Sequence, residues 1–169
     1  MPFVIDPSMA ARDLHFCVQS FLFHEAHLLD TRQFEAWRDL FTEDGRYWVP
    51  LRPDQKSPDS EASLFYDDKK IMGTRFERLR HPHIHSQTPH HRTCHLIGNV
   101  VTGDWELDGQ DLPVTSNLIM TDYRLRATRV FSGRVIHRLR VVSGNIRIAM
   151  KKVELINCDD AFELIAVPF

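Results

Sequence analysis

VFSGRVIHRLRVVSGNIRIAMKKVELIN, residues 130–157, decides the fold, because apolar and polar side chains alternate through much of it. An alternation with a period of two is typical of a β-strand with one buried face. In the first half, one face carries Val135, His137, Leu139 and Val141, and the other carries Ile136, Arg138 and Arg140. Ser143-Gly144-Asn145 interrupts the alternation with residues that favour a tight turn. The stretch therefore predicts a hairpin of the strands Val130–Val142 and Ile146–Asn157.

Two more extended, β-branched segments precede this hairpin, at His91–Glu106 and Leu112–Ala127. Asp108-Gly109 lies between them and is a strong turn signal. Four long strands joined in sequence order imply an antiparallel meander.

The N-terminal part has helical periodicity instead. Met9–Asp30 follows the capping pair Pro7-Ser8 and carries an apolar stripe at steps of three and four residues. The stripe consists of Leu14, Val18, Phe21, Leu22, Ala26 and Leu29. Thr31–Phe41 repeats the pattern, and Gly45 is expected to end that helix in a left-handed conformation.

A short strand is expected at RYWVPL, residues 46–51, followed by a polar loop, RPDQKSPDSEAS. Asp67-Asp68 can cap a third helix. In that helix the apolar residues that point one way are Ile71, Met72, Phe76 and Leu79. Three helices followed by a meander predict an α+β fold in which the helices cover the concave face of the sheet. No repeat or linker divides the chain, so residues 1–169 are expected to form a single domain.

The composition is that of an ordinary globular protein, with 43% hydrophobic residues, 26% charged residues and a net charge of −2. This balance gives no reason to expect nucleic acid or a membrane as a partner. Arginines gather between Arg124 and Arg147, but they alternate with apolar residues, which favours a solvated strand face or a subunit contact.

Three widely spaced cysteines indicate no disulfide framework. With no signal-peptide pattern and no long apolar run, the cytoplasm is the expected location.

The histidines cluster within residues 81–95, which raises the question of a metal site. Such a site needs three or four ligands about 2.0–2.3 Å from one ion. His91 and His95 would share a face of a strand but lie ~13 Å apart, too far to bind one ion. His83 and His85 would be ~6.6 Å apart, and they would still need a third ligand from elsewhere.

Iron centres fit the chain no better. A facial triad needs two histidines and a carboxylate, and no acidic residue lies within residues 81–101. A Rieske cluster needs two Cys-His pairs, and Cys94-His95 is a lone pair. His137 is a candidate third ligand beside the H-x-H pair His83 and His85. The favoured interpretation, however, is that the clustered histidines are polar residues of a loop and an interface. We therefore assign this chain no metal ligand, no cofactor-binding residue and no catalytic residue.

An ordered series of short motifs runs along residues 15–160. The series is Glu25-Ala26, Leu29-Asp30, Trp37, Leu40-Phe41, Asp44, Tyr47-x-Val49-Pro50, Tyr66-Asp67-Asp68, Arg75, Arg78-Leu79, Pro89-x-x-Arg92-Thr93-x-His95-Leu96-x-x-Asn99-Val100, Ser116-Asn117, Phe131-x-Gly133-Arg134 and Lys152-x-Glu154-Leu155. In this order the motifs resemble those of the small, or β, subunits of aromatic-ring-hydroxylating dioxygenases. The resemblance implies a cone of the cystatin-like or nuclear transport factor two-like type, in which a strongly curved antiparallel sheet wraps around the N-terminal helices.

The resemblance also implies a role. The chain would be a non-catalytic structural subunit of a bacterial multicomponent oxidoreductase that cis-dihydroxylates an aromatic compound. A partner α subunit would carry the Rieske [2Fe-2S] cluster and the mononuclear Fe(II), and NAD(P)H-dependent components would supply electrons. Such enzymes commonly contain three α and three β chains, so this chain is expected to form a trimer.

Interface residues are then the residues expected to matter most. The expected set is Tyr47, Trp48, Asp67, Asp68, Arg92, His95 and Asn99. The histidines at 81, 83, 85, 90 and 91 would form a loop that faces a partner.

Two other interpretations remain open. A lyase or isomerase similar to scytalone dehydratase would use histidine, aspartate and tyrosine inside the cone for proton abstraction. Its candidate residues are His24, His27, Asp30, Tyr47 and His95. A stand-alone binding or assembly module without an oxygenase partner is the third interpretation.

Overall fold

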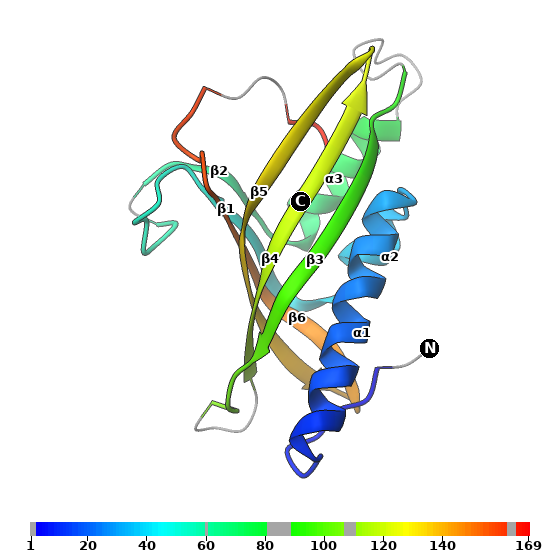
Figure 1. Cartoon of the computed structure of the whole chain (residues 1–169), viewed down its shortest axis with the longest axis vertical. Coiled ribbons are helices and arrows are strands. Elements are labelled where there is room, and N and C mark those ends of the chain that lie inside the picture. Colours follow the sequence, from blue (N-terminus) through cyan, green and yellow to red (C-terminus); the bar gives the residue numbers. More distant parts are fainter. Residues whose placement is uncertain (1–2, 60, 81–88, 107–110, 162–164) are drawn as a thin grey trace.

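The computed structural model describes residues 3–59, 61–80, 89–106, 111–161 and 165–169. Its elements, in chain order, are α1 (Ala11–Asp30), α2 (Phe34–Arg38), β1 (Phe41–Pro50), β2 (Ser63–Asp67), α3 (Lys69–Arg80), β3 (Arg92–Thr102), β4 (Asp111–Arg124), β5 (Ala127–Val142) and β6 (Asn145–Leu155). Figure 1 shows a strongly twisted sheet, with α1 running alongside β3 and α3 next to β1 and β2. The predicted α+β class, a curved sheet with N-terminal helices, is confirmed.

The described strands form one sheet in the order β2-β1-β6-β5-β4-β3. The strands β3 to β6 are antiparallel neighbours in sequence order, which confirms the predicted meander. β1 lies on the other side of β6, parallel to it, and pairs with β2 in the antiparallel direction. This parallel pair is a feature that the sequence pattern did not predict.

Burial along β5 follows the predicted alternation of apolar and polar residues. Val135, His137 and Leu139 are buried, and the intervening arginine Arg138 is exposed. Because one face is buried, a shift of one residue would turn the whole apolar set toward water. The pairing register is therefore strongly specified.

The predicted turn between β5 and β6 is present. Ser143 and Gly144 have φ angles of 51° and 77°, the two positive values that a type I′ turn requires. The other predicted turn, Asp108-Gly109, lies outside the described residues.

The first predicted helix forms, but it begins differently. α1 begins at Ala11 rather than Met9, and its N-cap residue, Ala10, makes no side-chain cap. The Ser8 hydroxyl instead donates to the Asp6 carboxylate in the turn ahead of the helix. The capping role predicted for Ser8 is therefore wrong, whereas the predicted apolar stripe is buried.

The second helix is shorter than predicted. α2 ends at Arg38, and Phe41 already belongs to β1. Gly45 therefore lies within a strand, and the prediction that it ends a helix is wrong. A Cβ atom at Gly45 would lie 2.8 Å from the backbone oxygen of Ile148. Glycine is needed there because β1 and β6 approach closely.

β2 occupies a segment for which the sequence predicts a loop followed by a helix cap, and no strand. Asp67 ends this strand, and Asp68 alone caps α3, because its carboxylate accepts a hydrogen bond from the Ile71 amide at 2.8 Å. The apolar residues of α3 that are buried as predicted are Met72, Phe76 and Leu79. Ile71 is instead 43% exposed.

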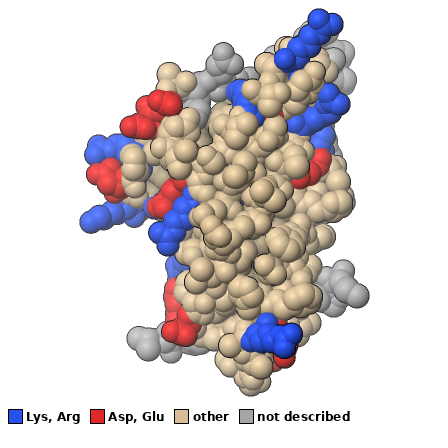
Figure 2. Space-filling view, in the orientation of Figure 1, with Lys and Arg blue, Asp and Glu red and all other residues tan. Residues whose placement is uncertain are grey.

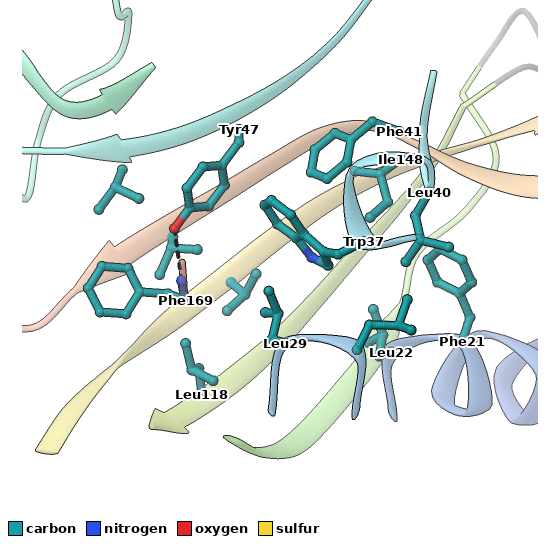
Figure 3. Packing of buried hydrophobic residues seen from close by; sticks show 14 of the residues in the cluster. Phe21, Leu22, Leu29, Trp37, Leu40, Phe41, Tyr47, Leu118, Ile148 and Phe169 are labelled. Carbon is teal, nitrogen blue, oxygen red and sulfur yellow. Dashed lines mark hydrogen bonds between the residues drawn. The ribbon is translucent and has the colours of Figure 1, made fainter. Parts of the chain in front are cut away.

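The helices pack their apolar side chains onto the concave side of the sheet (Figure 3). Trp37 of α2 lies beside Phe41 and Tyr47 of β1, with ring centroids 5.0 and 5.4 Å away. Phe169 is fully buried, and its backbone N–H donates to the Tyr47 hydroxyl at 3.0 Å. The C-terminal segment thus closes one end of the core.

Gly133 offers a sharp test of this packing. A Cβ atom there would lie 2.2 Å from the backbone oxygen of Glu154, so β5 and β6 would have to separate. We expect Gly133→Ala to lower the free energy of unfolding by about 2–3 kcal/mol, measured by urea denaturation. Gly98→Ala is the matched control, since nothing lies within 4 Å of its Cβ position. It should change that free energy by less than about 0.5 kcal/mol. Equal stabilities of the two variants would contradict the register.

Candidate functional site

A carboxylate lies inside the apolar core. Glu25 of α1 is only 3% exposed. Its Oε1 accepts hydrogen bonds from Lys151 Nζ at 2.7 Å and from Trp37 Nε1 at 3.0 Å. Its Oε2 lies 3.0 Å from His137 Nε2. These four residues, here called the interior cluster, join α1 and α2 to β5 and β6.

The electrostatics of the interior cluster favour a charged Glu25. Burial by itself would raise the pKa of this carboxyl. The charges of Lys151 and His137, and their hydrogen bonds, outweigh burial and hold the pKa well below its usual range. The cost of removing these groups from water is thus offset by their contacts with one another.

The strand register places two members of the interior cluster in a row across the inner face of the sheet. His137 of β5 is opposite Lys151 of β6, which is opposite Tyr47 of β1. Tyr47 is in turn opposite Asp67 of β2. Residues directly opposite each other share a face of the sheet. Four ionisable side chains from four strands therefore line up beneath the helices.

The other two members of this row also have partners within the chain. The Tyr47 hydroxyl accepts the Phe169 N–H, and burial raises the pKa of Tyr47. The Asp67 carboxylate accepts bonds from Arg75 Nε at 2.5 Å and Nη2 at 3.2 Å. Burial raises the pKa of Asp67 because it outweighs the effect of Arg75.

A cavity of about 160 Å³ lies at the end of this row. Its lining residues are Trp37, Tyr47, Phe65, Asp67, Met72, Arg75, Phe76, Arg78, Leu79, Ile165, Ala166, Val167 and Pro168. Most of this wall is aromatic or aliphatic, and Tyr47 and Asp67 already have hydrogen-bond partners. As far as the described residues form the wall, it does not include Glu25, His137 or Lys151. The cavity therefore reaches the interior cluster at the Trp37 ring, and its described wall gives a ligand no contact with the ionisable members of the cluster.

A second acid, the half-buried Asp30, joins the end of α1 to β3. Asp30 Oδ1 lies 2.6 Å from His95 Nδ1 and accepts the Thr93 hydroxyl at 2.9 Å. Asp30 Oδ2 accepts the His95 amide at 2.9 Å. Burial opposes ionisation, but the hydrogen bonds from His95, its charge and the Thr93 hydroxyl together lower the pKa of Asp30.

The histidine-rich stretch divides at the start of β3. His91 is 4% exposed, and its Nδ1 lies 2.7 Å from Asp122 Oδ1. Arg129 Nη2 donates to the other oxygen of Asp122 at 2.6 Å. His91 is thus a buried, paired residue, which corrects the expectation that it belongs to a loop facing a partner. His90 is exposed, and the histidines at 81, 83 and 85 lie outside the described residues.

Four of the seven expected interface residues have buried side chains. Tyr47 and Asp67 belong to the inner row, and the His95 side chain is 1% exposed. Trp48 is 5% exposed, and its Nε1 donates to Ser63 Oγ at 3.0 Å. These four side chains make their described contacts within the chain.

The other three expected interface residues are accessible. Arg92 and Asn99 are exposed, and Asp68 is half-buried where it caps α3. The Arg92 guanidinium lies 4.7 Å from the centre of the Tyr123 ring. Asn99 has a φ of 51° where the register shifts between β3 and β4. A partner could contact this second group without any rearrangement of the cone.

The residues of the dehydratase-like interpretation do not come together. Asp30 and His95 meet, but His27 is exposed on α1. His24 is half-buried, and the Tyr47 hydroxyl is bound by the backbone of the C-terminal segment. No shared site results from these five residues.

Within the described part of the chain, no group of three histidine, cysteine or acidic side chains could hold a metal ion. None of the described helices is both long and apolar enough to cross a membrane.

The sequence analysis missed the interior cluster, although one signal for it exists. Glu25 falls three residues after Leu22 and four after Phe21, on the apolar stripe of α1. A carboxylate on a buried stripe needs a partner. The partners themselves could not be identified, because His137 and Lys151 lie 112 and 126 residues further along the chain.

Most of the chain matches a known protein family in sequence. The profile of the family described as "Ring hydroxylating beta subunit" matches residues 24–159. The small oxygenase component of the p-cumate 2,3-dioxygenase system of Pseudomonas putida is 33% identical over 137 residues, covering 80% of this chain and 75% of the relative. The 2-halobenzoate 1,2-dioxygenase small subunit of Burkholderia cepacia is 30% identical over 145 residues, covering 83% of this chain and 87% of the relative.

Solved structures show the same fold. The β subunit of benzoate 1,2-dioxygenase from Burkholderia mallei is 27% identical, with a TM-score of 0.68 over 83% of this chain and 89% of that one. A chain of naphthalene 1,2-dioxygenase with indole bound in the active site is 20% identical, with a TM-score of 0.75 over 88% of this chain and 81% of that one. At this lower identity the likeness concerns the fold alone.

Removing the charge of Glu25 tests the interior cluster. Glu25→Gln leaves Lys151 buried without its carboxylate, so the free energy of unfolding should fall by about 3–5 kcal/mol at pH 7. The pKa of Glu25 is lower in the folded chain. Its stabilisation is therefore complete above the unfolded value of about 4.3 and is lost as the pH falls toward the folded value. Between pH 7 and pH 3 the difference in unfolding free energy between the wild type and Glu25→Gln should narrow by about 1.8 kcal/mol in urea denaturation.

The double variant Glu25→Gln/Lys151→Met is the control for this prediction. It removes both charges, so it should be more stable than Glu25→Gln alone. A stability gap between the wild type and Glu25→Gln that is the same at every pH would show that Glu25 is not a charged, paired group.

Proposed function

The chain belongs to the family of ring-hydroxylating β subunits, and on that premise we propose that it is the assembly subunit of a dioxygenase that acts on an aromatic compound. In this proposal it is a component of an oxidoreductase holoenzyme and supports a larger α subunit without taking part in the chemistry. Residues 1–169 act as one domain.

The observation that carries this proposal is the pairing of the interior polar groups. Glu25 is bonded to His137 and Lys151, and Asp67 is bonded to Arg75. A general acid or base must reach the proton that it transfers, directly or through one water molecule. Acids whose oxygens are already bonded to other groups of the chain suit a structural role better than a catalytic one.

The partner is proposed to carry the cofactors. β subunits of multicomponent dioxygenases pair with α subunits. For this chain we propose an α subunit that holds a Rieske [2Fe-2S] cluster and mononuclear Fe(II), fed by NAD(P)H-dependent electron-transfer components. We further propose three α with three β chains, self-association of this chain as a trimer, and a location in the cytoplasm.

The proposed interface set keeps all seven residues but separates their roles. Arg92, Asn99 and Asp68 are accessible and would contact a neighbouring subunit directly. The remaining four, Tyr47, Trp48, Asp67 and His95, would act from inside by holding β1, β2 and β3 in place.

Co-expression tests the proposal. The chain should co-purify with the dioxygenase α subunit encoded beside it, and the pair should oxidise members of an aromatic substrate panel to cis-dihydrodiols when electron-transfer components are added. The α subunit expressed alone is the control and should yield less soluble protein and less product. Failure of the two chains to associate would refute the proposal, and so would full activity of the α subunit alone.

A further inference from the structure

The turn between β4 and β5 uses residues that suit it poorly. Leu125 and Arg126 form a two-residue loop between the paired residues Arg124 and Ala127. Their φ angles are 50° and 66°, so both residues are left-handed, as a type I′ turn requires. Asn-Gly is the favoured pair in such turns, whereas a bulky side chain at positive φ is strained. This turn therefore holds Leu125 and Arg126 at a cost in stability.

The other two-residue hairpin turn shows that the chain can use suitable residues. Ser143-Gly144, between β5 and β6, has the same left-handed pair of φ angles but places glycine second. The two turns lie at opposite ends of β5. The unfavourable pair is thus specific to one end of the molecule. Strain of this kind persists where a site needs particular side chains.

The surface around Leu125 is apolar and positively charged. Leu125 is 65% exposed. Arg92 and Arg126 are exposed beside a groove of about 330 Å³. The groove is lined by Pro89, His90, Arg92, Tyr123, Arg124 and Leu125. In Figure 2, Lys and Arg side chains gather at the top of the view, at the end that the β4–β5 hairpin reaches in Figure 1.

Asp122, the acid of β4 that lies closest in sequence to this turn, does not neutralise the positive charge of this surface. Asp122 is 1% exposed and is already bonded to Arg129 and His91. Arg92 and Arg126 are exposed, so among the described residues of this end the excess charge is positive. A partner surface that fits it carries acidic groups around an apolar recess.

From these observations we infer that the β4–β5 hairpin end, here defined as Arg92, Tyr123, Arg124, Leu125 and Arg126, docks against an acidic surface of the dioxygenase α subunit. Leu125 seats in an apolar recess of that surface, and the exposed Arg92 and Arg126 pair with its carboxylates. The inference rests on the proposed function, because that function supplies the partner. A second copy of the chain docking end to end would bring two positive surfaces together, which opposes association.

The test uses three variants, two of which change the same hairpin type at opposite ends of β5. Leu125→Asn/Arg126→Gly installs the favoured type I′ pair and removes the proposed contacts of Leu125 and Arg126 while keeping Arg92. Ser143→Asn improves the other turn and leaves the hairpin end intact. Thermal unfolding of the full chain and its dissociation constant for the α subunit, measured by biolayer interferometry, are the two readouts.

The double substitution should make the chain more stable but weaken its binding to the α subunit. The thermal midpoint should rise by about 2–4 °C because strain is relieved. The dissociation constant should rise at least 10-fold, which means weaker binding. Ser143→Asn should leave α binding within twofold. Arg126→Gln, which keeps Leu125, should weaken binding by about three- to 10-fold and reduce its dependence on salt.

The outcomes separate the inference from the proposed function. If the wild-type chain binds the α subunit and the double variant binds within twofold of it, the inference is overturned and the proposed function stands. If Arg126→Gln leaves both affinity and salt dependence unchanged, the charged contact is refuted. If the wild-type chain does not bind the α subunit, the proposed function fails and the inference fails with it.

Discussion

The Glu25 carboxylate determines how helices and sheet meet. It lies in the core, where an unpaired charge would be very costly, so it must be met by donors from several directions. Those donors come from Trp37 in α2, His137 in β5 and Lys151 in β6. A rotation of α1, or a shift of β6 along β5, would leave a charged group of the interior cluster without its partner. The apolar core alone tolerates alternative packings more readily than this set of directional contacts does.

The same constraint explains why the chain suits a supporting role. In the described part of the chain the buried acids are Glu25, Asp67, Asp111 and Asp122, and Asp30 is half-buried. Each of these five acids is bonded to a cation or histidine of the same chain. Such pairs hold α1, β3 and the β1–β2 edge in fixed positions, which gives a rigid body for another subunit to rest on.

The regular parts of the fold could be predicted from the sequence because they depend on local periodicity. Alternation, β-branched composition and turn signals predicted the strands β3 to β6, and the three- and four-residue steps predicted the buried face of α1. Local patterns failed where tertiary contact decides. Gly45 resembles a helix terminator, yet its glycine is needed for the approach to Ile148. The short strand β2 forms only because β1 pairs with it.

The candidate site was less predictable than the fold. Tyr47, Asp67 and His95 were singled out, but their burial depends on the sheet register and on distant partners such as Asp30 and Phe169. Glu25 carried a local signal in its position on an apolar stripe. Identifying what it binds required the folded chain.

The most direct measurement of whether the interior cluster is structural is the turnover of the assembled enzyme. The Glu25→Gln/Lys151→Met chain is assembled with its α subunit, and turnover per α subunit is compared with the wild type while the complex remains intact. A structural cluster predicts turnover within about twofold of the wild type. A loss of 100-fold or more in an intact complex, the size expected when a general acid or base is removed, would contradict the account.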